Sequence, residues 1–457
     1  MYGFDISVVA TFHREGAIAV PTLRAIGLCR DAAWTAGLRV EIIATLDRAD
    51  SATRDIVQAW SRSNDHTRVI ELDVGDLGLA RNAAFAKAAG VYGCTMDGDD
   101  LMSPGWLVRA HRTASLHPTP AVVHPEYVIE FGAGTGVTRL QGMHPASDLV
   151  GALLATHPWT SCNFSSLQAY RDVPYLGSTG PWTGFGFEDW HWNVEQLALG
   201  RTHVVARQTF LLYRKRPNSL LAEQVGANRL VGPLTLFMPD RVLAQQGGGA
   251  PRRTEGRFAA WVRAVMHGRR SKPTQLAVVP PWALPELSTL HGCDSAVPST
   301  PSALKSHRYW EPRLNTAIGT EYARVVRRLW TPDVGRIARL TVVETPQAVG
   351  AALAATDGKI LMLSRQEPAA GGSPTSWLEA HERVIAVPSS DSLDAGEVEA
   401  LLTRLIVQLR PSCVEFESSA RLAAFADRYA LAFKSIGVRT TPGAWISAGS
   451  PTTTIES

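Results

Sequence analysis

The sequence predicts an α/β protein built on a mostly parallel sheet between helices. Short apolar segments alternate with helix-like segments through the first hundred residues, and the same alternation returns after residue 338. Strands that alternate with helices form βαβ units, and these units produce parallel sheets. The length of 457 residues also exceeds one ordinary domain. We therefore expect a large α/β domain followed by a second, smaller Rossmann-like α/β module.

The N-terminal elements are predicted from apolar runs and from helical periodicity. Apolar runs predict strands at residues 6–10, 40–44, 67–72 and 91–96. Helical patterns lie between them at residues 20–36, 52–61 and 78–89. Residues 103–220 show an irregular pattern with tryptophans at positions 106, 159, 182, 190 and 192. Aromatic residues in such a region more often pack than bind, although sugar rings also stack on them.

The C-terminal elements follow the same rules. Strand patterns occur at residues 339–343, 359–363, 384–387 and 413–416, and helical patterns at 397–410 and 420–435. A glycine run at residues 247–249 indicates a flexible linker, and the end of the chain is rich in Ser, Thr and Pro. We therefore expect a domain at residues 1–240, a mixed connector at 241–330, a Rossmann-like module, complete or incomplete, at 331–440, and a disordered tail at 441–457.

The composition excludes several classes of protein. A hydrophobic content of 45% with 19% charged residues is typical of a globular protein with a sizeable core. The net charge of +3 and the scattered basic residues do not indicate a nucleic-acid partner. The five cysteines are far apart, the N-terminus lacks a signal-peptide pattern, and no apolar run approaches the ~20 residues that cross a bilayer. We expect a cytoplasmic protein, for which peripheral membrane association remains open.

An acidic cluster follows the fourth predicted strand. Asp97, Asp99 and Asp100 place three carboxylates within four residues at the strand end. Such carboxylates repel one another unless a cation lies among them, and their oxygen atoms suit Mg²⁺ or Mn²⁺. In open α/β sheets, ligands bind at the carboxyl ends of the strands. Taken alone, the cluster is equally compatible with a solvated turn.

Five segments in order resemble a family 2 glycosyltransferase of the GT-A fold. They are residues 6–12 (ISVVATF), 41–47 (EIIATLD), 78–84 (GLARNAA), 97–100 (DGDD) and 184–190 (GFGFEDW). In order, they are similar to the opening strand and its turn, the second strand, the Gly-x-x-Arg-Asn segment, the D-x-D motif and the Glu-Asp motif of that family. The resemblance implies a GT-A domain in the N-terminal half.

The resemblance implies roles for individual residues. Asp189 would be the catalytic base, and Glu188 would position the acceptor or the neighbouring backbone. Asp99, assisted by Asp97, would hold Mn²⁺ or Mg²⁺, and Asp100 is the least certain member of the cluster. The donor nucleotide would be contacted by Thr11, Phe12, Asp47, Arg81, Asp97 and Arg216. Arg216 stands where the family frequently has a histidine, which leaves metal ligation at that position in doubt.

The implied function is metal-dependent, inverting transfer of a sugar from a UDP-, GDP- or dTDP-linked donor. The acceptor would be a glycan, polysaccharide or glycolipid, in the synthesis of cell-surface polysaccharide. A catalytically inactive GT-A scaffold that partners another transferase is the alternative. A nucleotidyltransferase is less favoured, because residues 11–16 lack a glycine-rich phosphate loop. Residues 335–440 weakly resemble the first Rossmann-like half of a GT-B glycosyltransferase, without the second half of that fold.

Overall fold

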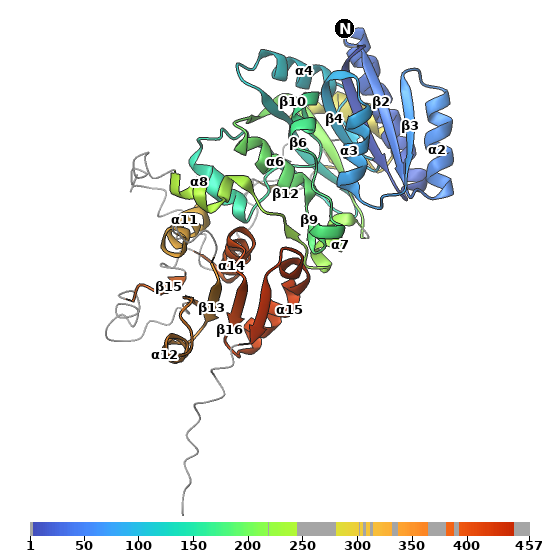
Figure 1. The fold of residues 1–457 in the computed structure, drawn as a ribbon. Coiled ribbons are helices and arrows are strands. Elements are labelled where there is room, and N and C mark those ends of the chain that lie inside the picture. The colour runs from blue at the N-terminus through green and yellow to red at the C-terminus, as the bar shows by residue number, and fades with distance from the viewer. Residues whose placement is uncertain are drawn as a thin grey trace, which may run out of the picture.

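The computed structural model describes residues 3–217, 219–244, 280–300, 302–304, 308–310, 314–330, 337–363, 381–387 and 393–442. These residues form a larger N-terminal body and a smaller C-terminal body (Figure 1). The predicted linker at residues 247–249 lies outside the described residues. The predicted tail lies outside them from residue 443 onward.

The N-terminal body is organised around one large sheet. Within the described residues this sheet has ten strands in the order β12-β7-β6-β8-β4-β1-β2-β3, and β10 joins it by pairing with β6 and β5. The strands are β1 (Phe4–Phe12), β2 (Val40–Asp47), β3 (Thr67–Leu72), β4 (Gly90–Asp97), β5 (Leu101–Met102), β6 (Ala121–Gly132), β7 (Gly136–Arg139), β8 (Phe164–Ser166), β10 (Thr202–Lys215) and β12 (Arg308–Trp310). A separate parallel pair is formed by β9 (Phe185–Gly186) and β11 (Leu230–Val231).

The first four strands are parallel, as predicted. β1 lies between β2 and β4, and β3 pairs with β2. All eight residues of β2 are buried, which is typical of a parallel strand covered on both faces. Thr11 near the end of β1 lies opposite Thr45 of β2 and Asp97 of β4. The carboxyl ends of these strands therefore meet at one edge of the sheet.

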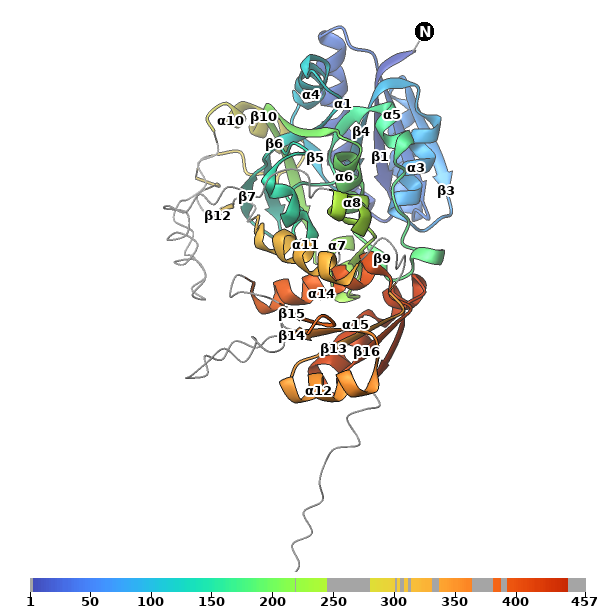
Figure 2. The same cartoon turned by 60° about the vertical axis from the view of Figure 1, so that its left-hand side comes forward.

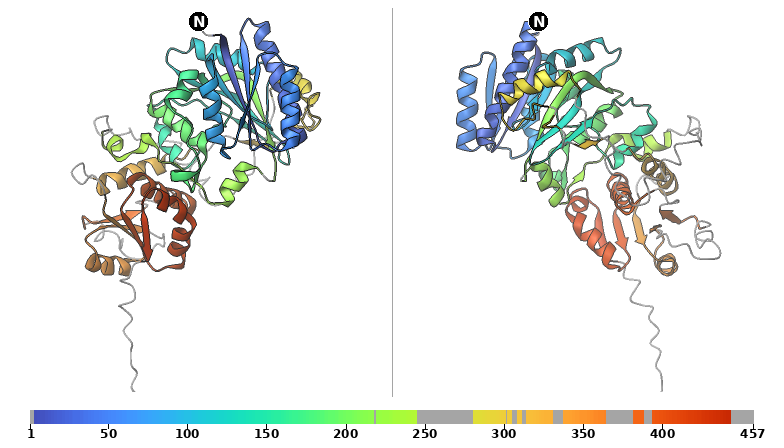
Figure 3. Two further views of the ribbon diagram at one scale, coloured as in Figure 1. Left: turned by 45° about the vertical axis from the view of Figure 1, so that its right-hand side comes forward. Right: turned by 180° about the vertical axis from the view of Figure 1, so that it is seen from behind.

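Helices cover both faces of this sheet (Figure 3). The predicted helices are confirmed, and side chains of Asp50 and Asp76 cap the second and third of them. The helices of this body are α1 (Ala19–Thr35), α2 (Ser51–Arg62), α3 (Leu77–Lys87), α4 (Trp106–Leu116), α5 (Leu167–Asp172), α6 (Glu188–Ala198), α7 (Leu220–Gly226), α8 (Pro239–Ala244) and α10 (Ala283–His291). Short 3-10 helices are η1 (Gly16–Ile18), η2 (Asp148–Leu154), η3 (Gly180–Trp182) and η4 (Thr235–Phe237).

The irregular sequence pattern of residues 103–220 did not indicate the strands that lie there. This region contains β6 and β10, the two longest strands of the described chain, which pair in parallel. Pro125 interrupts the strand pattern of β6, and the register of β10 shifts between Ala206 and Phe210. Both features remove the alternation by which a strand is recognised. The tryptophans of the region mostly pack, since Trp106 and Trp192 are fully buried.

The C-terminal body is the expected Rossmann-like module. Within the described residues its five strands are all parallel, in the order β15-β14-β13-β16-β17. The strands are β13 (Arg339–Val343), β14 (Lys359–Leu363), β15 (Val384–Val387), β16 (Cys413–Phe416) and β17 (Arg439–Pro442). The helices are α12 (Pro346–Ala355), α14 (Ala395–Leu409) and α15 (Ala420–Ser435). The four strands predicted for this module are confirmed.

The two bodies share a hydrophobic core. Helices α11 (Ala317–Leu329) and α14 lie between them (Figure 2). One cluster of buried side chains joins Phe185 and Leu234 of the N-terminal body to Tyr322 of α11 and Leu401 of α14. Residues 280–300 pack instead on the first sheet, where Leu287 of α10 contacts its core. The division of the chain at residues 240 and 331 stays a prediction.

Candidate active site

The predicted donor site lies at the carboxyl edge of the first sheet. Gly98 lets the turn after β4 pass close to the end of β1, because a Cβ there would lie 2.6 Å from Phe12 Cδ1 and 2.7 Å from the Thr11 carbonyl oxygen. The Phe12 ring is buried in the core. The hydroxyl of Thr11 is also buried, and it has no hydrogen-bond partner among the described residues. A buried unpaired hydroxyl at a ligand edge is a group that a bound molecule can satisfy.

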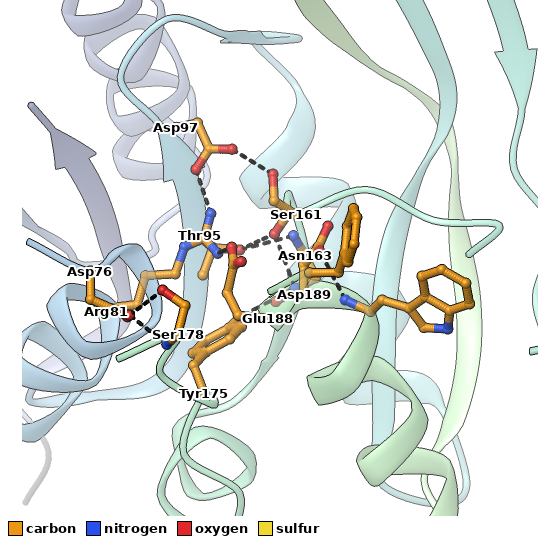
Figure 4. A network of polar contacts seen from close by, with 12 residues as sticks. Asp76, Arg81, Thr95, Asp97, Ser161, Asn163, Tyr175, Ser178, Glu188 and Asp189 are labelled. Carbon is orange, nitrogen blue, oxygen red and sulfur yellow. Dashed lines mark hydrogen bonds and ion pairs between the residues drawn. The ribbon is translucent and has the colours of Figure 1, made fainter. Parts of the chain in front are cut away.

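Arg81 connects the D-x-D strand to the Glu-Asp helix (Figure 4). Its guanidinium is fully buried and donates to Asp97 Oδ1 at 2.5 Å and to Glu188 Oε1 at 2.8 Å. Arg81 is therefore paired with two carboxylates, and its contact with the donor nucleotide stays a prediction. Burial lowers the pKa of Arg81, but Asp97 and Glu188 together outweigh this effect and raise the pKa above its ordinary value, so the guanidinium stays charged. A buried charge needs this compensation, and the two contacts hold α3, β4 and α6 in one arrangement.

Ser161 is a site residue that the sequence motifs did not indicate. Its hydroxyl donates to Asp97 Oδ2 at 2.6 Å, opposite the oxygen that Arg81 contacts. The Ser161 carbonyl oxygen accepts a hydrogen bond from the hydroxyl of Thr95 at 2.6 Å. Asp97 is thereby held on both oxygens. Ser161 lies in the segment whose sequence pattern is irregular, and no periodicity there marks it.

Asp99 and Asp100 differ in what they face. Asp99 pairs with Arg216 at 2.7 Å, and burial raises the pKa of Asp99 against the opposing effect of this arginine. Asp100 is almost fully buried and accepts a hydrogen bond from the backbone nitrogen of Arg214 at 2.9 Å. Burial raises the pKa of Asp100 well above its usual range. Asp100 therefore ties the turn to β10, whereas Asp99 and Arg216 face the edge of the site.

Arg214 is held by a residue from far along the chain. Its Nη2 donates to Asp294 Oδ2 at 2.5 Å, and its guanidinium lies 4.4 Å from the centre of the Phe131 ring. Asp294 follows α10, in the segment whose role the sequence left open. The connector therefore supports the wall of the predicted site.

The Asp47 side chain is bonded to the backbone of a neighbouring loop. Its carboxylate accepts hydrogen bonds from the backbone nitrogens of Val74, Gly75 and Asp76 at 2.8–3.0 Å. These bonds fix the loop between β3 and α3. Asp47 lies at the same strand edge as Asp97, but within the described part of the chain its side chain bonds to the loop after β3 and not to the Arg81 network. The base-contact role of Asp47 stays a prediction.

Glu188 and Asp189 begin helix α6. Phe187, the residue before them, has a left-handed backbone with φ of 55°, which turns the chain sharply into the helix. Burial raises the pKa of Glu188 to about 7, because Arg81 is shared with Asp97 and offsets only part of the desolvation. Burial also raises the pKa of Asp189. Asp189 Oδ1 accepts from the backbone nitrogen of Trp190 at 2.8 Å, and its side chain is 23% exposed.

We expect Glu188→Gln to change how stability depends on pH. Glu188 binds its proton more tightly in the folded protein than at its ordinary pKa of 4.5. The folded state therefore holds more protons between pH 4.5 and pH 7, and wild-type stability falls as pH rises through this window. Urea unfolding at several pH values gives the free energy of unfolding of wild type and of Glu188→Gln. The value for the variant minus the value for wild type should increase as pH rises. A difference that stays constant from pH 4 to pH 8 would contradict the raised pKa.

The carboxylates at the sheet edge suit a hard divalent cation. Asp97 and Asp99 offer oxygen atoms, and burial leaves the charge of Asp99 poorly hydrated. Among the residues that the structure describes, no group of three or more His, Cys, Asp or Glu side chains could hold a metal ion. Mg²⁺ is commonly bound by one or two carboxylates, with water and substrate phosphates completing its shell. The residues present fit a cation that binds together with a diphosphate.

The fold and the match to a family model define the class of the N-terminal body. The N-terminal body is a GT-A-like glycosyltransferase domain. Residues 7–169 match the model of Glycosyl transferase family 2, and the N-terminal part of the chain is a domain of that family.

Comparisons with known proteins gave distant similarities. No curated protein sequence matched the chain. Among solved structures, TarS 1-349 of S. aureus in complex with UDP-GlcNAc is 16% identical, with a TM-score of 0.41 over 71% of this chain and 87% of that one. The mannosyltransferase PcManGT of Pyrobaculum calidifontis, in complex with GDP-Man and Mn²⁺, is 16% identical, with a TM-score of 0.37 over 66% and 78% of the two chains.

Throughout the described ranges, each helix is too short or too polar to cross a bilayer.

Proposed function

We propose that this protein transfers a sugar from a nucleotide-diphosphate donor to a hydroxyl of a glycan, polysaccharide or glycolipid, with inversion at the anomeric carbon. The observation that supports this most directly is the buried Asp97–Arg81–Glu188 network, which joins the donor edge to the start of α6. This network supports the assignment of Asp189 as the base and of the neighbouring strand ends as the diphosphate site. A displacement reaction needs these two groups on opposite sides of the sugar.

Asp189 is the proposed base and Glu188 its positioning neighbour. Glu188 Oε1 is occupied by Arg81, whereas Asp189 keeps one oxygen free of hydrogen bonds from its own helix. The Asp189 carboxylate takes the proton of the acceptor hydroxyl as the acceptor oxygen bonds to the anomeric carbon. The bond from that carbon to the phosphate oxygen breaks, and its electron pair leaves on the diphosphate. The raised pKa of Asp189 makes it a stronger base than a solvated aspartate.

The donor edge is assigned to Thr11, Asp97, Asp99 and Arg216, with Phe12 and Asp47 supporting it. Asp99, assisted by Asp97, would hold Mn²⁺ or Mg²⁺, which when bound neutralises charge that develops on the leaving diphosphate. Arg216 is 28% exposed beside Asp99, and its guanidinium is available for electrostatic attraction to the same phosphates. Arg81 orients Asp97 through the ion pair between their side chains.

Replacing Asp99 by Ala tests the cation role. A metal ion supplies several kcal/mol of transition-state stabilisation, so we expect kcat/KM to fall by roughly a hundredfold or more. Turnover of UDP-, GDP- and dTDP-sugars with Mn²⁺ measures the loss, and calorimetry of Mn²⁺ with nucleotide diphosphate measures binding separately. Asp73→Ala, which removes a carboxylate that is 88% exposed, is the matched control. Undiminished turnover in Asp99→Ala would exclude the metal role.

A binding or scaffold protein with the GT-A fold is the second candidate. The observation that favours it is that both Asp97 and Asp99 already pair with arginines. A donor screen by thermal shift in Mn²⁺ separates the two functions when it is combined with turnover assays. Binding without turnover of any donor supports the scaffold, and absence of nucleotide binding with or without Mn²⁺ contradicts the transferase.

A further inference from the structure

One ring faces the proposed base, and no sequence motif indicates it. His157 Nδ1 lies 3.7 Å from Asp189 Oδ2. The other ring nitrogen, Nε2, accepts a hydrogen bond from Asn193 Nδ2 at 3.0 Å. With the Asn193 amide in this orientation its nitrogen donates, and His157 Nε2 then carries no proton. Burial lowers the pKa of His157 to about 3, so the ring is neutral and its single proton is on Nδ1, toward Asp189.

Asn193 is itself fixed in place. It lies one turn after Asp189 on α6, and its backbone carbonyl oxygen accepts a hydrogen bond from His203 Nε2 at 3.0 Å. His203 Nδ1 in turn accepts from His124 Nε2 at 2.8 Å, and both of these rings are buried. Two strands of the first sheet thus hold the residue that orients His157. The ring of His157 also stacks on Trp190 at a centroid distance of 5.8 Å.

The loop that carries His157 is held from the C-terminal module. This loop follows η2, whose last two carbonyl oxygens accept hydrogen bonds from different bodies. Trp190 Nε1 donates to Leu153 at 3.0 Å, and Arg404 Nε of α14 donates to Leu154 at 2.9 Å. Arg404 is buried, donates also to the Val231 carbonyl oxygen, and lies 5.5 Å from the centre of the Trp190 ring. A buried guanidinium so placed connects α14 to the start of α6.

We propose that His157 is a positioning residue for Asp189 and that the C-terminal module, through Arg404, keeps His157 in place. This inference rests on the proposed function, in which Asp189 is the base. The 3.7 Å separation is longer than a hydrogen bond, and the proposal includes that the two side chains approach each other when the acceptor binds, as catalytic contacts often do. The other titratable or charged groups that face Asp189 are Glu188 on its own helix, Arg81 of α3, Asp97 of β4, Tyr175 before η3 and Tyr213 of β10.

The test compares two substitutions of His157 in the full-length chain. His157→Phe keeps an aromatic ring and removes the Nδ1 proton, whereas His157→Asn keeps an amide donor near that position. A misplaced catalytic group costs on the order of tenfold to a hundredfold in rate, so we expect His157→Phe to lower kcat by at least about tenfold. KM for the donor should not change, and the acid limb of the pH profile should move to higher pH. His157→Asn should recover most of kcat.

Arg404→Met tests whether the C-terminal module keeps His157 in place. It should lower kcat as His157→Phe does. In the double variant, the fold-decrease in kcat should be smaller than the product of the two single fold-decreases. Arg428→Met is the matched control, because Arg428 contacts Glu399 and Tyr429 within the same module. If Arg404→Met fails to fold, Arg404→Lys, which keeps the charge and loses the Nε donor, takes its place. A kcat and pH profile unchanged in His157→Phe would overturn the inference.

A second readout separates this inference from the proposed function. The Asp189 carboxyl is titrated by ¹³C NMR of aspartate-labelled protein and assigned by its absence in Asp189→Asn. A donor removed from a carboxylate raises its pKa, so the midpoint should rise in His157→Phe. If the Asp189 midpoint rises in His157→Phe but the wild-type protein transfers no sugar, the proposed function is contradicted while the contact between His157 and Asp189 is supported. A midpoint that does not move would overturn the contact itself.

Discussion

Asp189→Asn is expected to lower kcat by roughly 10²- to 10⁴-fold, the contribution typical of a general base. The amide keeps the size and the hydrogen bond from the Trp190 backbone but cannot take the proton of the acceptor hydroxyl. Donor affinity should be retained, because the donor edge lies at the ends of β1 and β4 rather than on α6. Initial rates of sugar transfer with saturating donor measure kcat, and calorimetry with the donor measures affinity.

The control for this variant is a carboxylate of the same kind outside the site. Asp172→Asn removes an aspartate at the end of α5 that pairs with Arg201. We expect its kcat to equal that of wild type. If Asp189→Asn retained nearly full turnover while Glu188→Gln lost it, the base would be Glu188, and the roles of the two carboxylates would be exchanged.

Arg81→Met is expected to destabilise the N-terminal body by about 3–5 kcal/mol, because removing one partner of a buried ion pair leaves uncompensated buried charge. Two carboxylates, Asp97 and Glu188, would lose their common partner. Transfer activity should fall as well, since Asp97 would keep only the hydrogen bond from Ser161. Urea unfolding followed by tryptophan fluorescence measures the stability.

The exposed ion pair of Arg48 and Asp73 provides the control for Arg81→Met. Both of its side chains are more than half exposed, so Arg48→Met should cost at most about 1 kcal/mol. A second comparison is internal to the network. Arg81→Met combined with Glu188→Gln should be less destabilised than the sum of the single variants, because one uncompensated carboxylate is then absent. If Arg81→Met and Arg48→Met lowered the free energy of unfolding by equal amounts, Arg81 would not be an essential support of the fold.

Much of the fold was predictable where local patterns are strong. β3, β13, β14, β15 and β16 occupy the predicted residues, and so does α15. These are short apolar runs between clear breaks, or a helix with one apolar face. β6 and β10 were missed because a proline and a bulge disturb their pattern, and because their stability comes from pairing with each other across a large sequence separation.

The candidate site was predictable only in part, for a related reason. Asp97, Asp99, Glu188 and Asp189 lie in contiguous motifs that can be read along the chain. Ser161, His157 and Asp294 lie in segments without a motif, and each contacts a site residue that is far from it in sequence. A single contact of this kind leaves no periodicity in the sequence.

The sequence by itself determined the α/β class, the parallel direction of the first strands and the segments that carry the proposed chemistry. These properties follow from local apolar periodicity and from short motifs, which depend on neighbouring residues. The tertiary structure alone decided that Arg81 joins Asp97 to Glu188, that His157 faces Asp189, and that Arg404 connects the C-terminal module to this region. Such contacts form between side chains that folding brings together, where burial makes each unpaired charge costly and selects the arrangement that compensates it.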